Sequence, residues 1–367
     1  MPFRPLDRGK APVVKRKAAK EYCPKKKQQK KIDASLKYPA FLPSPDCGII
    51  HGQNRKNCVR DVNQVNPEPR YLQAYRSSEL SRKVKEGYER LAACDICPHH
   101  CGVNRLKEET GFCRSGSQAV ISSYAPHFGE EQPLVGTNGS GTIFFTFCNM
   151  RCVYCQNYEI SWLGVGRPVT SEELAGIMLE LQDYYRCHNI NLVTPTHFVP
   201  PILAALELAI KKGLRLPLVY NCGGYEDLKT LKLLDGIIDI YMPDFKYDDP
   251  EIAQKYSGVR DYPQIARLAL REMHRQVGDL VVDERGIAVR GLIVRHLVLP
   301  GGLAGTEGCM RYLATVSPQM FINIMSQYRP ENRAHEFPPL NRRITREEYR
   351  EALDLARRYG LKVRYKL

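Results

Sequence analysis

Six short apolar runs, separated by segments with helical periodicity, constrain the fold of this 367-residue chain most strongly. The runs are rich in β-branched residues, as strands buried on both faces of a parallel sheet should be. Parallel strands joined by helices require right-handed crossovers. We therefore expect an α/β fold in which the sheet curls into a partial (β/α)6 barrel. The runs are residues 142–147, 190–194, 216–221, 237–243, 291–299 and 320–325.

Helix boundary signals lie between these runs. Thr170 with Glu173, and Thr345 with Glu348, have the spacing of capping boxes, in which each side chain satisfies a backbone group of the other residue. A segment that starts with the prolines of "VPPILAALELAIKKG" keeps helical spacing until Gly213. These signals support the alternation of strands and helices.

Polar clusters follow five of the predicted strands. They are the cysteine loop after residue 147 and the stretches "TPTH", "NCGG", "PDFKY" and "LPGG". In barrels of parallel strands the chemistry takes place at the C-terminal ends of the strands. The clusters therefore predict one site at that end of the barrel.

The loop "CNMRCVYC" places Cys148, Cys152 and Cys155 within eight positions, directly after an apolar strand. Structural zinc takes four ligands, and this loop offers three. Three thiolates can instead each bind one iron of a [4Fe–4S] cluster and leave the fourth iron without a protein ligand. The alternative is a set of three buried or zinc-binding cysteines.

The C-x3-C-x2-C spacing, the strand before it and Tyr154 before the last cysteine resemble the signature of the radical S-adenosylmethionine (SAM) superfamily. The resemblance implies that SAM binds the open iron through its amino and carboxylate groups. One electron from the reduced cluster then splits SAM into methionine and a 5′-deoxyadenosyl radical, which abstracts hydrogen from a substrate. From about Cys94 onward the chain is similar to the pyruvate formate-lyase activating enzyme group, especially its cysteine-extended relatives of unassigned substrate.

That second resemblance implies further cofactor-binding residues. Tyr154 and Gln156 would lie against SAM, and Asp244 and Lys246 of "PDFKY" would lie beside it.

The same resemblance implies a monovalent cation near the SAM carboxylate. Met242 and Asp244 match its positions, and Asn221 could complete the set. Tyr220 stands where an aspartate is expected, so the cation site departs from the family pattern.

The family's Gly-Gly-Glu motif, which binds the SAM amino group, is replaced by "NLVTPTHFVPP". We expect Thr194, Thr196 and nearby carbonyls to accept those hydrogen bonds. His197 either reaches SAM or the substrate, or is satisfied locally at a helix start; both interpretations stay open. We expect His296, in a strand, to have a core role.

Four upstream cysteines form a C-x2-C-x3-C-x11-C block, which is enough for a closed metal site. The block favours a second iron–sulfur cluster, with tetrathiolate zinc as a close alternative and free structural thiols as another. His99 or His100 could replace a cysteine as ligand. The four cysteines are Cys94, Cys97, Cys101 and Cys113.

Composition limits the compartment and the partners. The chain has 13 cysteines, an odd number, and lacks a secretory signal, so we expect a cytoplasmic protein without a disulfide framework. Residues 1–37 hold 13 Lys/Arg against 3 Asp/Glu, so this arm supplies +10 of the net charge of +14. We interpret it as a poorly ordered, solvated tail and expect neither a nucleic-acid nor a membrane partner. We expect no metal site at Cys23, Cys47 and Cys58.

The predicted domains are a basic arm (1–75), a cysteine-rich metal-binding module (76–135) and a radical SAM partial barrel (136–367). The predicted function is that of a radical SAM oxidoreductase, with activation of a glycyl-radical enzyme as the leading substrate hypothesis. Its expected partners are SAM and an electron donor such as flavodoxin or ferredoxin. The alternatives are radical modification of a peptide or RNA, and a non-catalytic iron–sulfur electron-transfer or sensor protein.

Overall fold

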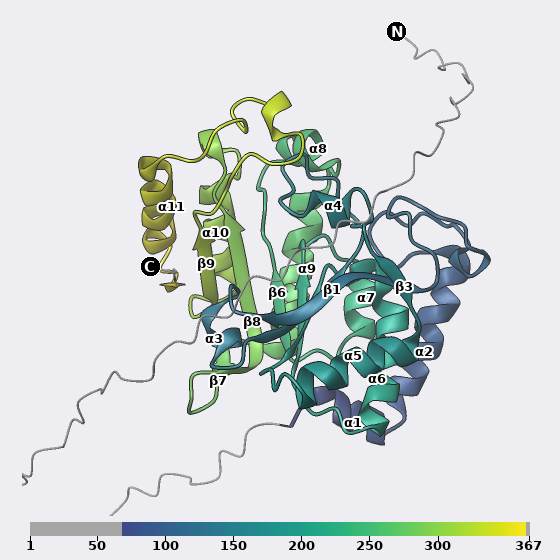
Figure 1. Ribbon diagram of the computed structural model, residues 1–367. Coiled ribbons are helices and arrows are strands. Elements are labelled where there is room, and N and C mark those ends of the chain that lie inside the picture. Colours follow the sequence, from purple (N-terminus) through teal and green to yellow (C-terminus); the bar gives the residue numbers. More distant parts are fainter. Residues whose placement is uncertain (1–67, 365–367) are drawn as a thin grey trace, which may run out of the picture. The chain divides into compact units, whose positions relative to one another are not determined.

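The computed structural model describes residues 68–364, which form a mixed α/β fold around one large, mostly parallel sheet (Figure 1). The strand order is β10-β9-β8-β6-β5-β4-β2-β1-β3, and β7 pairs with β8. The strands are β1 (Ala119–His127), β2 (Ser140–Phe145), β3 (Arg167–Val169), β4 (Ile190–Val193), β5 (Leu218–Cys222), β6 (Ile240–Pro243), β7 (Val281–Val282), β8 (Ala288–Leu297), β9 (Phe321–Met325) and β10 (Val363–Arg364).

Helices connect the strands. The α-helices are α1 (Arg70–Arg76), α2 (Glu79–Glu89), α3 (Gln132–Val135), α4 (Tyr158–Ser161), α5 (Ser171–Asp183), α6 (Val199–Lys211), α7 (Leu228–Leu233), α8 (Pro250–Ser257), α9 (Tyr262–Val277), α10 (Thr306–Val316) and α11 (Arg346–Arg358). Short 3-10 turns lie at Arg90–Ala93, Arg105–Lys107, Thr196–Phe198, Pro300–Gly302 and Ala334–Glu336.

All six apolar runs form strands, as predicted. β2, β4, β5, β6, β8 and β9 lie side by side in chain order, and each neighbouring pair is parallel. Every residue of β5 and β6 is buried, as an apolar strand covered on both faces should be. The path of paired strands ends at β3 and at β10 without closing. This is the arrangement that a partial barrel requires.

The antiparallel strand β1 extends the sheet beyond β2, and the sequence did not predict it. Of its nine residues only Ala119 and Ile121 are buried, and Pro126 lies within it, so its apolar signal is weak. The connection from β1 to β2 carries α3, whose Leu134 is fully buried. Leu134 packs in one apolar cluster with strand residues Val219, Ile240, Met242, Ala288 and Ile293.

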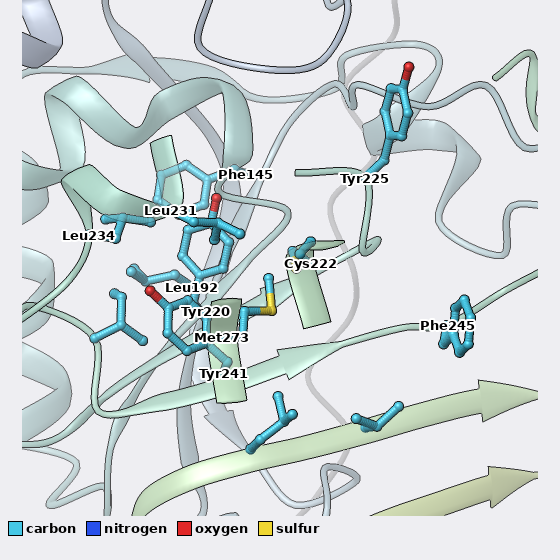
Figure 2. Packing of buried hydrophobic residues seen from close by; sticks show 14 of the residues in the cluster. Phe145, Leu192, Tyr220, Cys222, Tyr225, Leu231, Leu234, Tyr241, Phe245 and Met273 are labelled. Carbon is cyan, nitrogen blue, oxygen red and sulfur yellow. The ribbon is translucent and has the colours of Figure 1, made fainter. Parts of the chain in front are cut away.

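The predicted caps are present. Thr170 and Glu173 form a capping box at α5, and Thr345 and Glu348 form one at α11. On the helix-covered face of the sheet, side chains of α7 and α9 gather around Tyr220 and Tyr241 (Figure 2). These two rings meet edge to face at 5.8 Å between centroids.

The first described helix corrects the expected arm boundary. Residues 70–76 form α1, in which Tyr71 is fully buried and its hydroxyl donates to the Leu216 carbonyl. Asp239 accepts hydrogen bonds from the backbone N–H groups of Arg70 and Leu218, which ties α1 to the sheet. The other expectations for the arm, including those for its cysteines, lie outside the described residues. Within residues 68–364 no helix is long and apolar enough to cross a membrane.

We predict that Leu134→Ala lowers the free energy of unfolding by about 2–5 kcal/mol, because a fully buried leucine leaves a cavity when truncated. Leu268→Ala, at a position 44% exposed on α9, is the matched control and should change it by less than about 1 kcal/mol. Anaerobic denaturant unfolding measures both variants. Equal losses would contradict the role of Leu134 in filling the barrel interior.

Asp239 predicts a pH dependence of stability. Burial raises its pKa to about 7, above about 4 in the unfolded chain, so between these values the native state binds the extra proton. Stability therefore falls as pH rises through this window, by up to about 1.4 kcal/mol per pH unit. Asp239→Asn removes the titrating carboxyl. The decrease in the free energy of unfolding between about pH 5 and pH 7 should therefore be about 2 kcal/mol smaller in this variant than in the wild type. Glu284→Gln, at an exposed site, should leave the slope unchanged; an unchanged slope in Asp239→Asn would refute the assignment.

Candidate functional site

The C-terminal ends of the parallel strands surround a cavity of about 250 Å³. Nine of the residues predicted to bind the cluster or SAM line it, from β5 and from the connections that follow β2, β4 and β6. They are Cys148, Cys152, Tyr154, Cys155, Gln156, Thr194, Asn221, Asp244 and Lys246. Four of the five polar clusters thus contribute to one cavity, although only Thr194 of "TPTH" lines it. The fifth cluster, "LPGG" at residues 299–302, does not line the cavity.

The three-cysteine loop follows β2 after a residue with a strained backbone, and hydrogen bonds to α8 hold the loop in place. Phe147 has φ +61°, a left-handed conformation that a bulky side chain rarely adopts. The backbone N–H groups of Arg151 and Val153 donate to carbonyls at the C-terminal end of α8, at 3.0 and 2.9 Å. The loop thus has a fixed backbone.

Each sulfur of the loop contacts a polar group, and burial raises the pKa of the Cys148 and Cys152 thiols, the latter to about 11. Uncharged thiols of this kind are poor nucleophiles, and a bound metal is what converts such groups into thiolates. The contacts are the Met150 N–H to Cys148 Sγ at 3.4 Å, the Ser257 hydroxyl to Cys152 Sγ at 3.0 Å, and Cys155 Sγ with the Ser161 hydroxyl at 3.1 Å.

The donor set fits a cluster better than a single ion. Among residues 68–364, no three His, Cys, Asp or Glu side chains form a group that could hold a metal ion. The cysteine ligands of an iron–sulfur cluster bind different irons, so their sulfurs need not converge on one point. Three thiols that border a cavity large enough for a ligand on the open iron fit a [4Fe–4S] cluster.

A charged network spans three strand ends in the wall of the cavity. Asp244 accepts hydrogen bonds from Lys246 Nζ at 2.5 Å and from Arg295 Nε at 2.9 Å. Arg295 also donates to Asn221 Oδ1 at 2.7 Å. Burial raises the pKa of Asp244, but the two cations outweigh it and hold the pKa below its usual range. Asp244 is therefore ionised at neutral pH.

This network corrects the expected cation site. The guanidinium of Arg295 lies between Asp244 and Asn221, where the resemblance implied a monovalent cation. Met242 is fully buried in the apolar interior cluster instead. Sequence analysis missed Arg295, although a single charge inside the apolar run "GLIVRHLVLP" was a usable signal.

Two predicted SAM ligands do not reach the cavity. Thr194 lines it, but its φ of +60° turns the chain, and the following residues enter the core. Thr196 donates to Glu226 at 2.7 Å, and His197 Nε2 meets the Thr146 carbonyl at 2.8 Å. Both side chains are buried, and burial lowers the pKa of His197 to about 3. Nε2 of His197 is thus satisfied locally, whereas its buried Nδ1 has no hydrogen-bond partner among residues 68–364.

Glu226 is a buried carboxyl that no motif or spacing in the sequence indicated. It accepts hydrogen bonds from Thr196 and, at 2.9 Å, from the Tyr220 hydroxyl. Burial raises its pKa to about 7. It lies behind Cys222, which lines the cavity.

Tyr154 borders the cavity but is packed more tightly than expected, at 5% exposure. Its hydroxyl bonds to that of Tyr247 at 2.6 Å, which bonds to Ser257 at 2.8 Å, and Ser257 in turn contacts Cys152. The tyrosine therefore anchors the cysteine loop as well as forming part of the wall. Gln156 donates to the Gln327 carbonyl at 3.2 Å.

His296 has the core role expected for it. It is fully buried, with Nδ1 at 2.7 Å from the Phe245 carbonyl and Nε2 at 3.0 Å from the Thr306 hydroxyl. The upstream cysteines lie in a turn-rich segment, where the Cys94 N–H donates to the Val103 carbonyl at 2.9 Å. This segment contacts the three-cysteine loop through His99, whose Nε2 lies 2.9 Å from the Asn149 carbonyl.

Comparison with known proteins gives a match to the Radical SAM superfamily model over residues 142–284. The uncharacterized protein MJ0674 of Methanocaldococcus jannaschii is 34% identical over 304 residues, which cover 80% of this chain and 83% of that protein. The uncharacterized protein MJ0808 of the same organism is 27% identical over 170 residues, which cover 40% of this chain and 49% of that protein. A radical SAM methyltransferase from Sphaerobacter thermophilus matches in structure with a TM-score of 0.40 and 15% identity, over 61% of this chain and 66% of that one.

The segment matched by the superfamily model contains the three-cysteine loop and also Asn221, Asp244 and Lys246, which line the same cavity. Sequence family and site geometry thus identify the same region of the molecule. The chain contains a Radical SAM superfamily domain.

Proposed function

We propose that this protein is a radical SAM enzyme whose [4Fe–4S] cluster is bound by Cys148, Cys152 and Cys155. The Radical SAM superfamily domain supports SAM-dependent radical chemistry with an iron–sulfur cluster and a reductant. The observation that carries the residue assignment is that all three thiols border one cavity with the ends of five other parallel strands or their connections. When bound, the reduced cluster supplies the electron that splits SAM and yields the hydrogen-abstracting radical.

The surrounding residues have separate tasks in this proposal. Lys246 and Arg295 supply positive charge in the cavity wall, and Asp244 fixes the position of both. Because the side-chain oxygen of Asn221 accepts a hydrogen bond from Arg295, its amide nitrogen is the group that would donate to a ligand. Tyr154 and Phe145 form an apolar part of the wall, which suits an adenine ring and excludes water.

For the substrate, we propose a glycine backbone in a partner enzyme, as the resemblance to pyruvate formate-lyase activating enzymes implies. The sheet path ends at β3 and β10 without closing, which is compatible with entry of a peptide loop. A peptide or RNA substrate is the alternative. The electron donor in this proposal is a flavodoxin or ferredoxin, and a cytoplasmic location and the oxidoreductase class remain predictions.

Residues 76–135 form, in the same proposal, a cysteine-rich module that binds a second metal centre. Cys94, Cys97 and Cys113 are buried and Cys101 is partly buried. An iron–sulfur cluster is the first candidate. Zinc is the alternative, and it would require the sulfurs to move together, because no three of them now converge on one ion.

We predict that the reduced, reconstituted protein converts SAM into 5′-deoxyadenosine and methionine, and that Cys152→Ala reduces this to background because the cluster loses one of three protein ligands. Chromatography of the products under anaerobic conditions is the measurement. Cys187→Ala, at a buried thiol outside the cavity, is the matched control and should retain turnover. Normal turnover in Cys152→Ala would remove the loop from the site.

The substrate proposal predicts that reduced enzyme with SAM produces a glycyl radical in a glycyl-radical enzyme from the same cell. The doublet signal in electron paramagnetic resonance (EPR) is the measurement, and the Cys152→Ala variant is the negative control. If 5′-deoxyadenosine forms but no candidate enzyme develops the doublet, glycyl-radical activation is wrong and peptides or RNA become the substrates to test.

A further inference from the structure

A buried guanidinium lies beside the upstream cysteines. Arg105 is 1% exposed and donates to the Gly116 carbonyl from Nε at 3.0 Å and from Nη2 at 2.6 Å. Its Nη1 lies 3.8 Å from Cys94 Sγ. No carboxylate within residues 68–364 forms an ion pair with it. A buried charge without an opposite charge is strongly destabilising, so a negatively charged group beside Arg105 would stabilise the fold.

Backbone donors point at two more of these sulfurs. The Phe112 N–H lies 3.4 Å from Cys101 Sγ. Gly111 allows this approach, since a Cβ there would lie 2.6 Å from Cys101 Sγ. At Cys97, burial raises the pKa of the thiol, and the backbone N–H of His99 acts in the opposite direction. A neutral thiol is a weak acceptor, whereas bonds to an ionised acceptor are much stronger. Three of the four sulfurs therefore have donors suited to thiolates.

Two hydrogen bonds join this block to the three-cysteine loop. Arg151 Nη2 donates to the Phe112 carbonyl at 2.8 Å, which connects the residue before Cys152 with the residue before Cys113. The second is the contact of His99 with Asn149, the residue after Cys148. The Phe112 ring lies between them, stacked on His99 at 3.8 Å between centroids and 4.8 Å from the Arg151 guanidinium.

We propose that Cys94, Cys97, Cys101 and Cys113 bind an auxiliary iron–sulfur cluster that passes electrons to the cluster at the cavity. This inference rests on the proposed function of the three-cysteine loop. A one-electron donor protein of the ferredoxin or flavodoxin class is oxidised by one electron and reduces the auxiliary cluster. That cluster returns to its oxidised state by reducing the cavity cluster, so one electron passes for each SAM molecule cleaved.

Iron–sulfur rather than zinc accounts for the whole set of contacts. Thiolates bound to either metal would neutralise Arg105, but zinc has no redox chemistry. Hydrogen bonds to sulfur set the potential of an iron–sulfur cluster, and short links between the two cysteine segments suit electron transfer. A structural zinc transfers no electrons, so it would not explain why hydrogen bonds connect the two cysteine segments.

The first experiment is metal and sulfide analysis of the Cys148/Cys152/Cys155→Ala variant, prepared anaerobically with the full chain. We expect iron and labile sulfide to remain bound and to give an EPR signal after reduction, whatever becomes of SAM cleavage. Adding Cys94→Ala to that variant should remove this signal, and adding Cys187→Ala instead should not. Zinc in place of iron, or soluble protein without either metal, overturns the proposal.

The second experiment compares two reductants in the Cys113→Ser variant, with Cys187→Ser as the control. The readout is the ratio of two SAM-cleavage rates: the rate with ferredoxin or flavodoxin, divided by the rate with dithionite, a small reductant that reaches the cavity cluster directly. In Cys113→Ser this ratio should fall severalfold relative to the wild type, while EPR still detects the cavity cluster. Equal loss with both reductants, or no loss with either, overturns the electron transfer. Absence of SAM cleavage in the wild type would instead refute the proposed function, and the first experiment would still decide the metal.

Discussion

The bridge from Asp244 through Arg295 to Asn221 fixes the geometry on which the site depends. The three residues come from the ends of β6, β8 and β5, and a backbone bridge between Asp244 and Arg295 accompanies their side-chain bonds. Both charges lie in a largely buried setting, where each requires the other, because a single buried charge would be strongly destabilising. Lys246 then binds the second oxygen of Asp244 and is held at the cavity. Because β5, β6 and β8 are neighbours in the sheet, their ends hold the charges of Asp244, Lys246 and Arg295 in fixed positions at the cavity.

Local signals in the sequence predicted the parts of the site that depend on short segments. Cys148, Cys152 and Cys155 are recognisable from spacing alone, and the six parallel strands from apolar runs that are buried on both faces. Arg295 was missed because its partners Asp244 and Asn221 lie 51 and 74 residues away in the sequence. No periodicity can detect such a contact.

The misplaced ligands have a different physical cause. Thr196 and His197 follow a strand end, so strand order alone placed them at the site. The left-handed conformation of Thr194, costly for a β-branched residue, sends the chain into the core instead. Phe147 is in the same conformation at the end of β2. Strained residues of this kind cost on the order of 1–3 kcal/mol and cluster at functional sites. Phe147 directly precedes the three-cysteine loop, and Thr194 itself lines the cavity.

Two buried cations, Lys83 and Arg105, differ in the groups that balance their charge, and this difference shows what is unusual about the segment from Cys94 to Cys113. Lys83 and Arg105 are both at most 8% exposed. Lys83 Nζ lies 3.3 Å from the Glu79 carboxylate and donates to the Leu233 carbonyl at 2.9 Å. Arg105 has a carbonyl and a cysteine sulfur. Because the same fold pairs Lys83 with a formal negative charge, the thiolate form of Cys94 is the partner that would give Arg105 the equivalent environment. Thiolate ligands of the proposed auxiliary cluster would supply this negative charge beside Arg105.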